Sequence, residues 1–306
     1  MRVLITGGSG LLGRALVRVF SRNHSAVSPA HADMDITQPA RVREFMDAHR
    51  PDLVIHAAAI ADVDRCEQDP DAAYRVNAQG AHNAALACAE RDAALVFIST
   101  DYVFDGTKAV PYTEYDETRA LNVYGRAKIA AEQAVATFCW KHYIVRSAWL
   151  FASWGNNFVT TTLARTQRGE TVRAVSDQYS SPTSAIDLAE TIARLVAQPD
   201  YGVYHLANRG VHSRYDMARA ICRVARLDES LAQPIPASEA RRPAPRPMFT
   251  ALRNYRLELL GGDFMRPFEE ALAECVASIS HQSSEKLFGN TDRFQSQGNR
   301  APGFET

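Results

Sequence analysis

A glycine-rich turn close to the N-terminus constrains the fold of this chain more than any other feature. Residues 2–6 form an apolar run typical of a buried strand, and the sequence GGSGLLG from Gly7 to Gly13 leads directly into a segment whose apolar residues recur with helical spacing. Glycines at such a turn let a pyrophosphate approach the backbone and let the helix pack closely on the strand. The pattern favours a dinucleotide-binding turn over the alternative, a glycine-rich turn that binds nothing.

Strands and helices alternate through the first half of the chain. We expect strands at about 2–6, 53–57, 94–98 and 143–147, and helices near 11–22, 38–49, 71–91 and 122–137. This alternation predicts an α/β fold with a Rossmann-type, doubly wound parallel sheet. Ligands of such sheets bind at the carboxyl ends of the strands. The residues that follow two of the expected strands are Ala57-Ala58-Ala59 and Ser99-Thr100-Asp101.

The pattern loosens after about residue 150, where Pro182 and the proline-rich stretch from Pro234 to Pro247 separate shorter elements. We expect an NAD(P)-binding Rossmann domain over residues 1–150, to which parts of the later chain could return. A smaller substrate-binding lobe is expected over residues 151–280. Residues 281–306 are rich in Ser, Gln, Asn and Gly, which is typical of a disordered tail or an appended segment.

Composition excludes several classes of protein. The net charge of −1 argues against a broad surface for nucleic acid or for an anionic membrane. No apolar run has the length of a membrane span, and the N-terminus has the pattern of a strand rather than of a signal peptide, so we expect a cytoplasmic protein. The five cysteines are widely spaced and lack a Cys-x-x-Cys pair, which predicts buried free thiols rather than disulfides or a zinc site.

Tyr124 and Lys128 lie four residues apart in an expected helix, so their side chains share one face. A free tyrosine titrates near pH ~10, and a neighbouring ammonium stabilises the phenolate and lowers that pKa. The pair therefore predicts a proton donor, although the same spacing also occurs on exposed helices with no catalytic role.

Four features occur in one order: the glycine-rich turn, the two strand-end segments, and the Tyr-x-x-x-Lys pair. In this the chain resembles the extended short-chain dehydrogenase/reductase superfamily and, within it, the dTDP-4-dehydrorhamnose reductase family, over residues 1 to about 278. The motifs that carry the closer resemblance are Ala57-Ala58-Ala59-x-x-x-Val63-Asp64-x-x-Glu67, Ser99-Thr100-Asp101-Tyr102-Val103-Phe104-Asp105-Gly106, Leu121-Asn122-Val123-Tyr124-Gly125, Arg146-x-x-Trp149, Asn157-Phe158-Val159, Asp177-Gln178-x-x-x-Pro182-Thr183 and Arg246-Pro247-x-x-Thr250-x-Leu252.

The resemblance implies reduction of a dTDP-linked 4-keto-6-deoxy sugar by NADPH or NADH. Tyr124 would protonate the oxygen at C4, Lys128 would hold the nicotinamide ribose and lower the tyrosine pKa, and Thr100 would hydrogen-bond the same oxygen. For Thr100 the alternative is a strand-end hydroxyl that caps local backbone. The cofactor-binding residues implied are Gly7, Gly10, Leu11, Leu12, Gly13, His31, Ala57, Ala58, Ala59, Tyr124 and Lys128.

The family pattern also points to residues that bind the substrate. Trp149 suits a sugar or base face, Arg246 suits a diphosphate, and both residue types also serve ordinary structural roles. The full expected set is Asp101, Tyr102, Trp149, Asn157, Gln178 and Arg246.

Two departures from the family pattern bear on cofactor and metal. The region Val27-Ser28-Pro29-Ala30-His31 offers neither a clear acid for an NAD ribose nor an arginine for an NADP phosphate, so the choice stays open and leans to NADPH. Some family members bind magnesium through a glutamate two residues past the last glycine of the turn. This chain has Ala15 there, so we expect no metal.

Two other functions fit the same residues. One is another nucleotide-sugar 4-ketoreductase or an epimerase of this superfamily; an epimerase would consume no net reductant. The other is a non-catalytic NADP-binding regulatory subunit resembling the beta subunit of methionine adenosyltransferase. The resemblance also allows a homodimer, because many superfamily members use the helices corresponding to 71–91 and 122–137 for dimer contacts.

Overall fold

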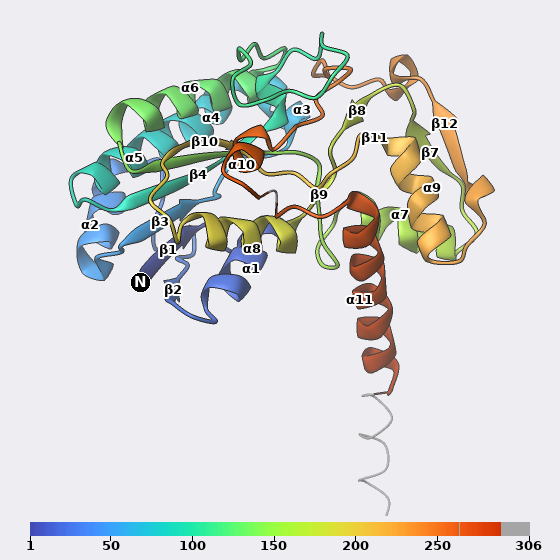
Figure 1. The fold of residues 1–306 in the computed structure, drawn as a ribbon, viewed down its shortest axis with the longest axis horizontal. Helices are drawn as coiled ribbons and strands as arrows, with labels where there is room; N and C mark the ends of the chain where they lie inside the picture. Colours follow the sequence, from blue (N-terminus) through green and yellow to red (C-terminus); the bar gives the residue numbers. More distant parts are fainter. Residues whose placement is uncertain (263, 289–306) are drawn as a thin grey trace, which may run out of the picture.

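The computed structural model, which describes residues 1–262 and 264–288, is built on a six-stranded sheet whose strands all run parallel (Figure 1). The strand order is β10-β5-β4-β3-β1-β2. These strands are β1 (Arg2–Thr6), β2 (Ser25–Val27), β3 (Leu53–His56), β4 (Ala94–Thr100), β5 (His142–Ser147) and β10 (Gly202–His205). The predicted α/β fold with a doubly wound parallel sheet is confirmed.

Alternate residues of the central strands pack on opposite layers of helices. Val3 and Ile5 face α1 (Leu11–Phe20) and α8 (Ala185–Leu195), whereas Leu4 faces the other layer. That second layer is formed by α2 (Pro39–His49), α5 (Gly80–Ala89) and α6 (Val123–Phe138). Burial on both faces explains why the strands are continuous apolar runs. Each aliphatic side chain buried in this way stabilises the fold by about 1.5–3 kcal/mol.

The chain moves from β1 to β2 on one side and later to β3 on the other, so the strand order reverses between β1 and β3. The glycine-rich turn follows β1, and Ala57-Ala58-Ala59 follow β3. Both segments therefore border the crevice in which open α/β sheets bind their ligands.

The segment expected as one helix at 71–91 is more complex. After α3 (Val63–Gln68), Asp69 caps a new helix, α4 (Pro70–Ala73), by accepting a hydrogen bond from Ala72 N at 3.0 Å. A π-helical stretch, η1 (Tyr74–Gln79), then leads into α5. Within it the buried Asn77 side chain hydrogen-bonds both the backbone N and O of Ile60. Such π-helical segments are frequent near functional sites, and this one fixes the loop after β3.

A smaller lobe lies beside the sheet at its carboxyl edge (Figure 1). Its core joins α7 (Phe158–Gln167), α9 (Arg214–Val224) and α11 (Phe268–Phe288), with β7 (Val172–Val175) and β12 (Ala232–Ile235) pairing alongside. The short elements are β6 (Leu150–Phe151), β8 (Tyr179–Ser180), β9 (Thr183–Ser184), β11 (His212–Ser213), α10 (Tyr255–Leu259), and the 3-10 turns η2 (Asp101–Val103), η3 (Glu229–Leu231) and η4 (Ala237–Ala240).

Two elements beyond residue 150, α8 and β10, belong to the sheet and its helical layers rather than to the lobe. The division of the chain at residue 150 therefore stays a prediction, and the sheet with its helical layers contains elements from both sides of that residue. Helix α11 continues to Phe288, past the start of the tail expected at 281–306, and the rest of that tail lies outside the described residues.

No helix in the described part of the chain combines the length and apolar character needed to cross a membrane. All five cysteines are buried free thiols, as expected.

Candidate active site

Two glycines of the glycine-rich turn have no room for a side chain, Gly7 because of the loop after β3 and Gly13 because of the turn's own backbone. Gly7 has φ of 71°, and a Cβ there would lie 2.8 Å from the Ala58 backbone. A Cβ on Gly13 would lie 2.0 Å from the carbonyl oxygen of Gly7. Positive φ and close backbone approach both require glycine.

The N-terminus of α1 opens into this crevice without a cap of its own. Gly10 is the N-cap residue, no side chain caps the helix, and its first turn holds no acidic residue. The first N–H groups of a helix lack intrahelical partners and carry partial positive charge. Anions bind well at such an end, so the turn can hold the pyrophosphate of a dinucleotide.

Two cavities meet at this turn and share walls formed by Gly7, Gly10, Ala57 and Ala59. One, of about 710 Å³, extends along the ends of β1 and β2, and His31 and Asp35 line it. The other, of about 370 Å³, extends over the ends of β4 and β5. Together they form one long crevice with the glycine-rich turn at its middle, which suits a dinucleotide.

Asp35 at the first cavity does not take the place of a ribose-binding acid at the end of β2. Its carboxylate accepts hydrogen bonds from Thr37 N, Thr37 Oγ1 and Gln38 Nε2, and these, led by the Thr37 backbone bond, lower its pKa. His31 is exposed at the rim of the cavity.

Tyr124 reaches the second cavity because the start of α6 is held from three sides. The buried side chain of Asn122 accepts a hydrogen bond from Gly125 N at 2.9 Å and donates one to Pro245 O. Glu67 accepts one from Val123 N at 2.9 Å. A Cβ on Gly125 would lie 2.1 Å from Tyr102 O, so glycine there lets the helix approach η2.

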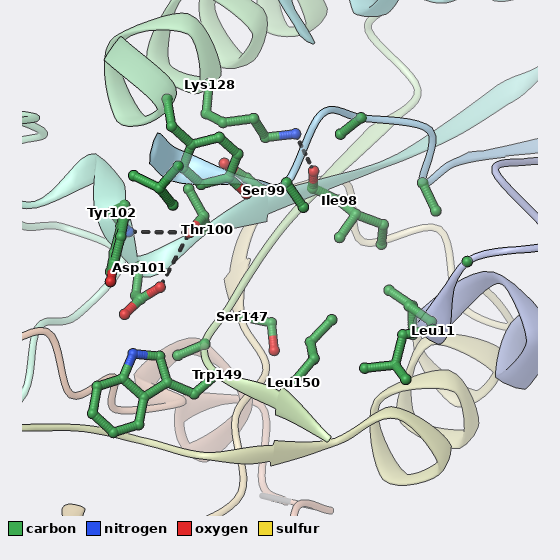
Figure 2. A pocket seen from close by; sticks show the side chains of 18 of the residues that line it. Leu11, Ile98, Ser99, Thr100, Asp101, Tyr102, Lys128, Ser147, Trp149 and Leu150 are labelled. Carbon is green, nitrogen blue, oxygen red and sulfur yellow. Dashed lines mark hydrogen bonds between the residues drawn. The ribbon is translucent and has the colours of Figure 1, made fainter. Parts of the chain in front are cut away.

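Lys128 is buried one turn further along α6, and its Nζ donates a hydrogen bond to Ile98 O at 2.5 Å (Figure 2). The same atom lies 4.0 Å from the centre of the Phe97 ring. Burial lowers the pKa of Lys128 to about 7, and the charge of Glu132 opposes that shift. The ammonium is therefore close to titrating at neutral pH.

The pKa of Tyr124 moves in the direction opposite to our expectation. Burial raises it above its usual range, and hydrogen bonding with Thr100 opposes the shift in part. The expected lowering by Lys128 is wrong for this arrangement, because the Lys128 ammonium is turned onto Ile98 O and its own charge is disfavoured by burial. Tyr124 thus keeps its proton at neutral pH, which is the form a general acid needs.

Thr100 lines the cavity and also organises the turn that follows β4. Its Oγ1 accepts a hydrogen bond from Tyr102 N and donates one to Asp101 Oδ1, both at 3.1 Å (Figure 2). Asp101 Oδ2 in turn accepts hydrogen bonds from Ser180 at 2.9 Å and Thr250 at 2.5 Å. Burial raises the pKa of Asp101 to about 6. The local capping considered for Thr100 therefore coexists with a place in the cavity wall.

Asp101, Tyr102 and Trp149 gather at the end of the cavity away from Leu11 (Figure 2). This end is separate from the glycine-rich turn and is where a substrate can lie beside a cofactor. Trp149 has φ of 43°, which is unusual for a bulky residue. Strained backbone of this kind clusters at functional sites.

Three residues expected to bind substrate do not line either cavity. Asn157 caps α7, accepting from Val159 N at 3.0 Å and donating to Ala152 O at 2.9 Å. Gln178 accepts a hydrogen bond from Arg242 at 3.2 Å. Arg246 donates to Asp64 Oδ1 at 2.9 Å and to Ala244 O at 2.7 Å. In this arrangement these polar atoms are bonded to other parts of the protein.

Sequence reasoning did not identify Arg214 or Ser147, both of which line the second cavity. Ser147 Oγ is buried and has no hydrogen-bond partner in the described part of the chain, so it is available to a ligand. The signal for Arg214 was indirect: Ser213 and Asp216 form a capping box that starts α9 at this residue. Only the fold brings it to Trp149. No group of three or more His, Cys, Asp or Glu side chains among the described residues could hold a metal ion.

Comparison with known proteins adds to this geometry. The family model described as RmlD substrate binding domain matches residues 1–281. The dTDP-4-dehydrorhamnose reductase of Mycolicibacterium smegmatis is 38% identical over 282 residues, which cover 91% of this chain and 86% of that protein. The dTDP-4-keto-6-deoxy-D-glucose reductase of Streptomyces niveus is 39% identical over 285 residues, covering 92% and 99%.

A solved structure is similar along nearly its whole length. The crystal structure of dTDP-4-dehydrorhamnose reductase from Bacillus anthracis in complex with NADP superposes with a TM-score of 0.88 at 35% identity, covering 90% of this chain and 99% of that one. The chain therefore belongs to the dTDP-4-dehydrorhamnose reductase family of the extended short-chain dehydrogenase/reductase superfamily.

Proposed function

We propose that this protein is an NAD(P)H-dependent reductase that converts the C4 ketone of dTDP-4-dehydro-L-rhamnose to the alcohol of dTDP-L-rhamnose. The observation that carries the proposal is the meeting of Thr100, Tyr124 and Lys128 in a cavity whose other wall is the glycine-rich turn. In this proposal the proton donor and the residues that hold the cofactor border one cavity of about 370 Å³. Family membership supports the oxidoreductase class and the nicotinamide cofactor.

The residues present fit such a cofactor. The uncapped N-terminus of α1 and the two glycines without room for a Cβ suit its pyrophosphate, and Ser147 Oγ offers an unused hydrogen-bonding group further along the crevice. Bound NAD(P)H supplies the hydride for a ketone reduction. We propose NADPH as the preferred form, because the end of β2 presents no free acid for a ribose hydroxyl.

Tyr124 acts as the general acid in this proposal. Reduction places negative charge on the oxygen at C4, and the buried phenol, protonated at neutral pH, gives that oxygen its proton. The O–H of Thr100 would turn from Asp101 Oδ1, which accepts it here, to donate to the same oxygen, while Oγ1 keeps accepting from Tyr102 N.

We propose that Lys128, once a bound cofactor favours its charged form, offsets part of the rise that burial gives to the pKa of Tyr124. A protonated Lys128 stabilises the phenolate left after proton transfer and holds the ribose of the cofactor. The anionic pyrophosphate raises the pKa of nearby cations, so cofactor binding favours the charged form of Lys128, whose pKa burial lowers to about 7.

A second candidate substrate is dTDP-4-keto-6-deoxy-D-glucose. The observation in its favour is the 39% identity to the Streptomyces niveus reductase that is named for that sugar. The two candidates differ in configuration at C3 and C5, the carbons on either side of the reacting ketone, and the roles proposed for Tyr124, Lys128 and Thr100 concern only the oxygen at C4, which both sugars share.

Product analysis separates the two substrates. The purified protein is incubated with NADPH and dTDP-4-keto-6-deoxy-D-glucose, with and without a 3,5-epimerase, and the products are identified by chromatography and NMR. We expect dTDP-L-rhamnose only when the epimerase is present. Equal turnover without the epimerase, yielding a D-configured sugar, would transfer the assignment to the second candidate.

A further inference from the structure

Arg214 lines the end of the cavity away from the glycine-rich turn. Its charge and those of Arg242 and Arg246 lower the pKa of the Tyr102 phenol, which burial raises. A cation at the end of a cavity in a nearly neutral protein suits an anionic ligand. The three arginines differ in how far the protein already uses their N–H donors.

Arg246 is already engaged by the protein. Its Nη1 contacts Asp64 Oδ1 at 2.9 Å and Ala244 O at 2.7 Å, and its side chain is only 10% exposed. This pairing joins the proline-rich segment to α3. Arg242 is exposed and hydrogen-bonds Gln178. Neither side chain lines the cavity.

Arg214 does line the cavity, and its guanidinium is fixed without an ion pair. It is the first residue of α9, and its charged group lies 3.9 Å from the ring centre of Trp149 and 4.9 Å from that of Phe158. No carboxylate among the described side chains forms an ion pair with it; the hydrogen bond recorded for it is to Met217 Sδ at 3.7 Å. Stacking on two aromatic rings orients the guanidinium and leaves the donors other than Nη1 available to a ligand.

A half-buried cation without an ion-pair partner lowers the stability of the protein, because its lost hydration is not replaced by a nearby anion. Burial lowers the pKa of Arg214 to about 10, so it stays charged at neutral pH. Asp101, the carboxylate whose charge acts on Arg214, already accepts hydrogen bonds from Thr100, Ser180 and Thr250. The missing partner is therefore an anion that enters with a ligand.

We infer that Arg214, held on Trp149, binds the diphosphate of the nucleotide-sugar substrate. The inference rests on the proposed function only in taking the substrate to carry a diphosphate. It reassigns to Arg214 the role that the family pattern suggested for Arg246, which does not line the cavity and whose Nη1 already donates to Asp64 and Ala244 O. A guanidinium fork pairs with phosphate oxygens through two parallel hydrogen bonds, and aromatic stacking sets the plane of that fork.

The test measures binding rather than turnover. Calorimetric titration of the NADP-saturated protein with dTDP and with thymidine is carried out on wild type, Arg214→Gln and Arg219→Gln. Arg219 is a matched control, because it lies on the same helix, stacks on Tyr215 and is paired with Glu229 outside the cavity. We expect Arg214→Gln to weaken dTDP binding by about 10- to 100-fold, the usual effect of losing charge-assisted hydrogen bonds.

Thymidine and NADP affinities should stay unchanged in Arg214→Gln, and Arg219→Gln should match wild type throughout. Should Arg214→Gln fail to fold, Arg214→Lys keeps the charge and loses the fork, and we expect it to weaken dTDP binding by several-fold. Wild-type dTDP affinity in these variants, or a wild type that binds dTDP no better than thymidine, would overturn the inference.

The two proposals fail in different ways. Arg214-dependent dTDP binding without turnover of any 4-keto sugar would support this inference and reject the proposed reaction. Turnover of the keto sugar with unchanged dTDP affinity in Arg214→Gln would do the reverse.

Discussion

The buried ion pair between β5 and α6 tests how the protein holds the candidate active site together. Arg146 on β5 contacts Glu132 on α6 through Nη2 at 2.7 Å and Nε at 3.0 Å, and Ser99 Oγ donates to the same carboxylate at 2.5 Å. The two side chains are 6% and 8% exposed. The pair thus joins the two strand ends that border the cavity to the helix that carries Tyr124 and Lys128.

We expect Glu132→Gln to lower the free energy of unfolding by about 3–5 kcal/mol. Removing one partner of a buried ion pair leaves the other charge without compensation, and that is the usual magnitude. The Arg146 guanidinium has little other support, since its Nη1 is already buried without a hydrogen-bond partner among the described residues. Replacing both residues, as in Glu132→Gln/Arg146→Met, should restore part of the loss because no unpaired charge remains.

Urea unfolding followed by circular dichroism measures these differences. Glu170→Gln is a matched control, because Arg165 and Glu170 form an ion pair that is 42% and 44% exposed, and exposed pairs contribute about 0–1 kcal/mol. If Glu132→Gln costs no more than Glu170→Gln, or if the double variant is less stable than Glu132→Gln alone, the reasoning about the buried charge is wrong. Loss of the Glu132 charge should also lower the pKa of Lys128 further.

Three further predictions concern the glycine-rich turn and helix α6. Gly13→Ala should weaken NADPH binding by more than about tenfold in a fluorescence titration, since its Cβ would lie 2.0 Å from Gly7 O. Gly169→Ala is the control, because Gly169 has φ of 73° and nothing within 4 Å, so its substitution should lower stability only. Equal NADPH affinity in the two variants would contradict this prediction. In the proposed mechanism the protonated form of Lys128 is the active one, and burial lowers its pKa to about 7. The kcat/KM for NADPH, which reports the free enzyme, should therefore fall as pH rises above about 7. Between pH 7 and the pKa of about 10.4 that Lys128 has in the unfolded chain, folding releases this proton, so the contribution of Lys128 to the free energy of unfolding rises with pH over that range. If a Lys128→Met variant keeps the decline in kcat/KM, Lys128 is not the group that causes the decline. Asn122→Ala removes the cap of α6 and should lower stability by about 0.5–2 kcal/mol in thermal unfolding, with kcat reduced and NADPH affinity preserved; a variant with full activity would show that the cap does not position Tyr124.

Local patterns predicted β1, β3, β4 and β5 because each is an apolar run in a regular alternation with helices. They did not place β2 or β10, since Ser25–Val27 and Gly202–His205 are short and only their pairing with β1 and β5 makes them part of the sheet. The break between α3 and α4 had a signal in Asp69-Pro70, a helix cap followed by a proline at the first helical position.

The site divides in the same way. The glycine-rich turn, Thr100, Tyr124 and Lys128 were predictable because each lies in a short contiguous motif. Arg214 was not, because only the tertiary fold stacks it on Trp149. The family pattern and the residue type suggested Arg246 for an anion, but a sequence does not show that Asp64 and Ala244 O already accept hydrogen bonds from its Nη1.

The most direct test of the central claim is NADPH oxidation by wild type and Tyr124→Phe. The assay follows absorbance with dTDP-4-keto-6-deoxy-D-glucose, a 3,5-epimerase and a control without the sugar. We predict sugar-dependent NADPH loss with wild type and a fall of about 100- to 10,000-fold in kcat for Tyr124→Phe, the range for a general acid, with NADPH affinity unchanged. Comparable turnover by Tyr124→Phe would contradict the role of Tyr124 as the proton donor, and no sugar-dependent oxidation by wild type would contradict the reaction itself.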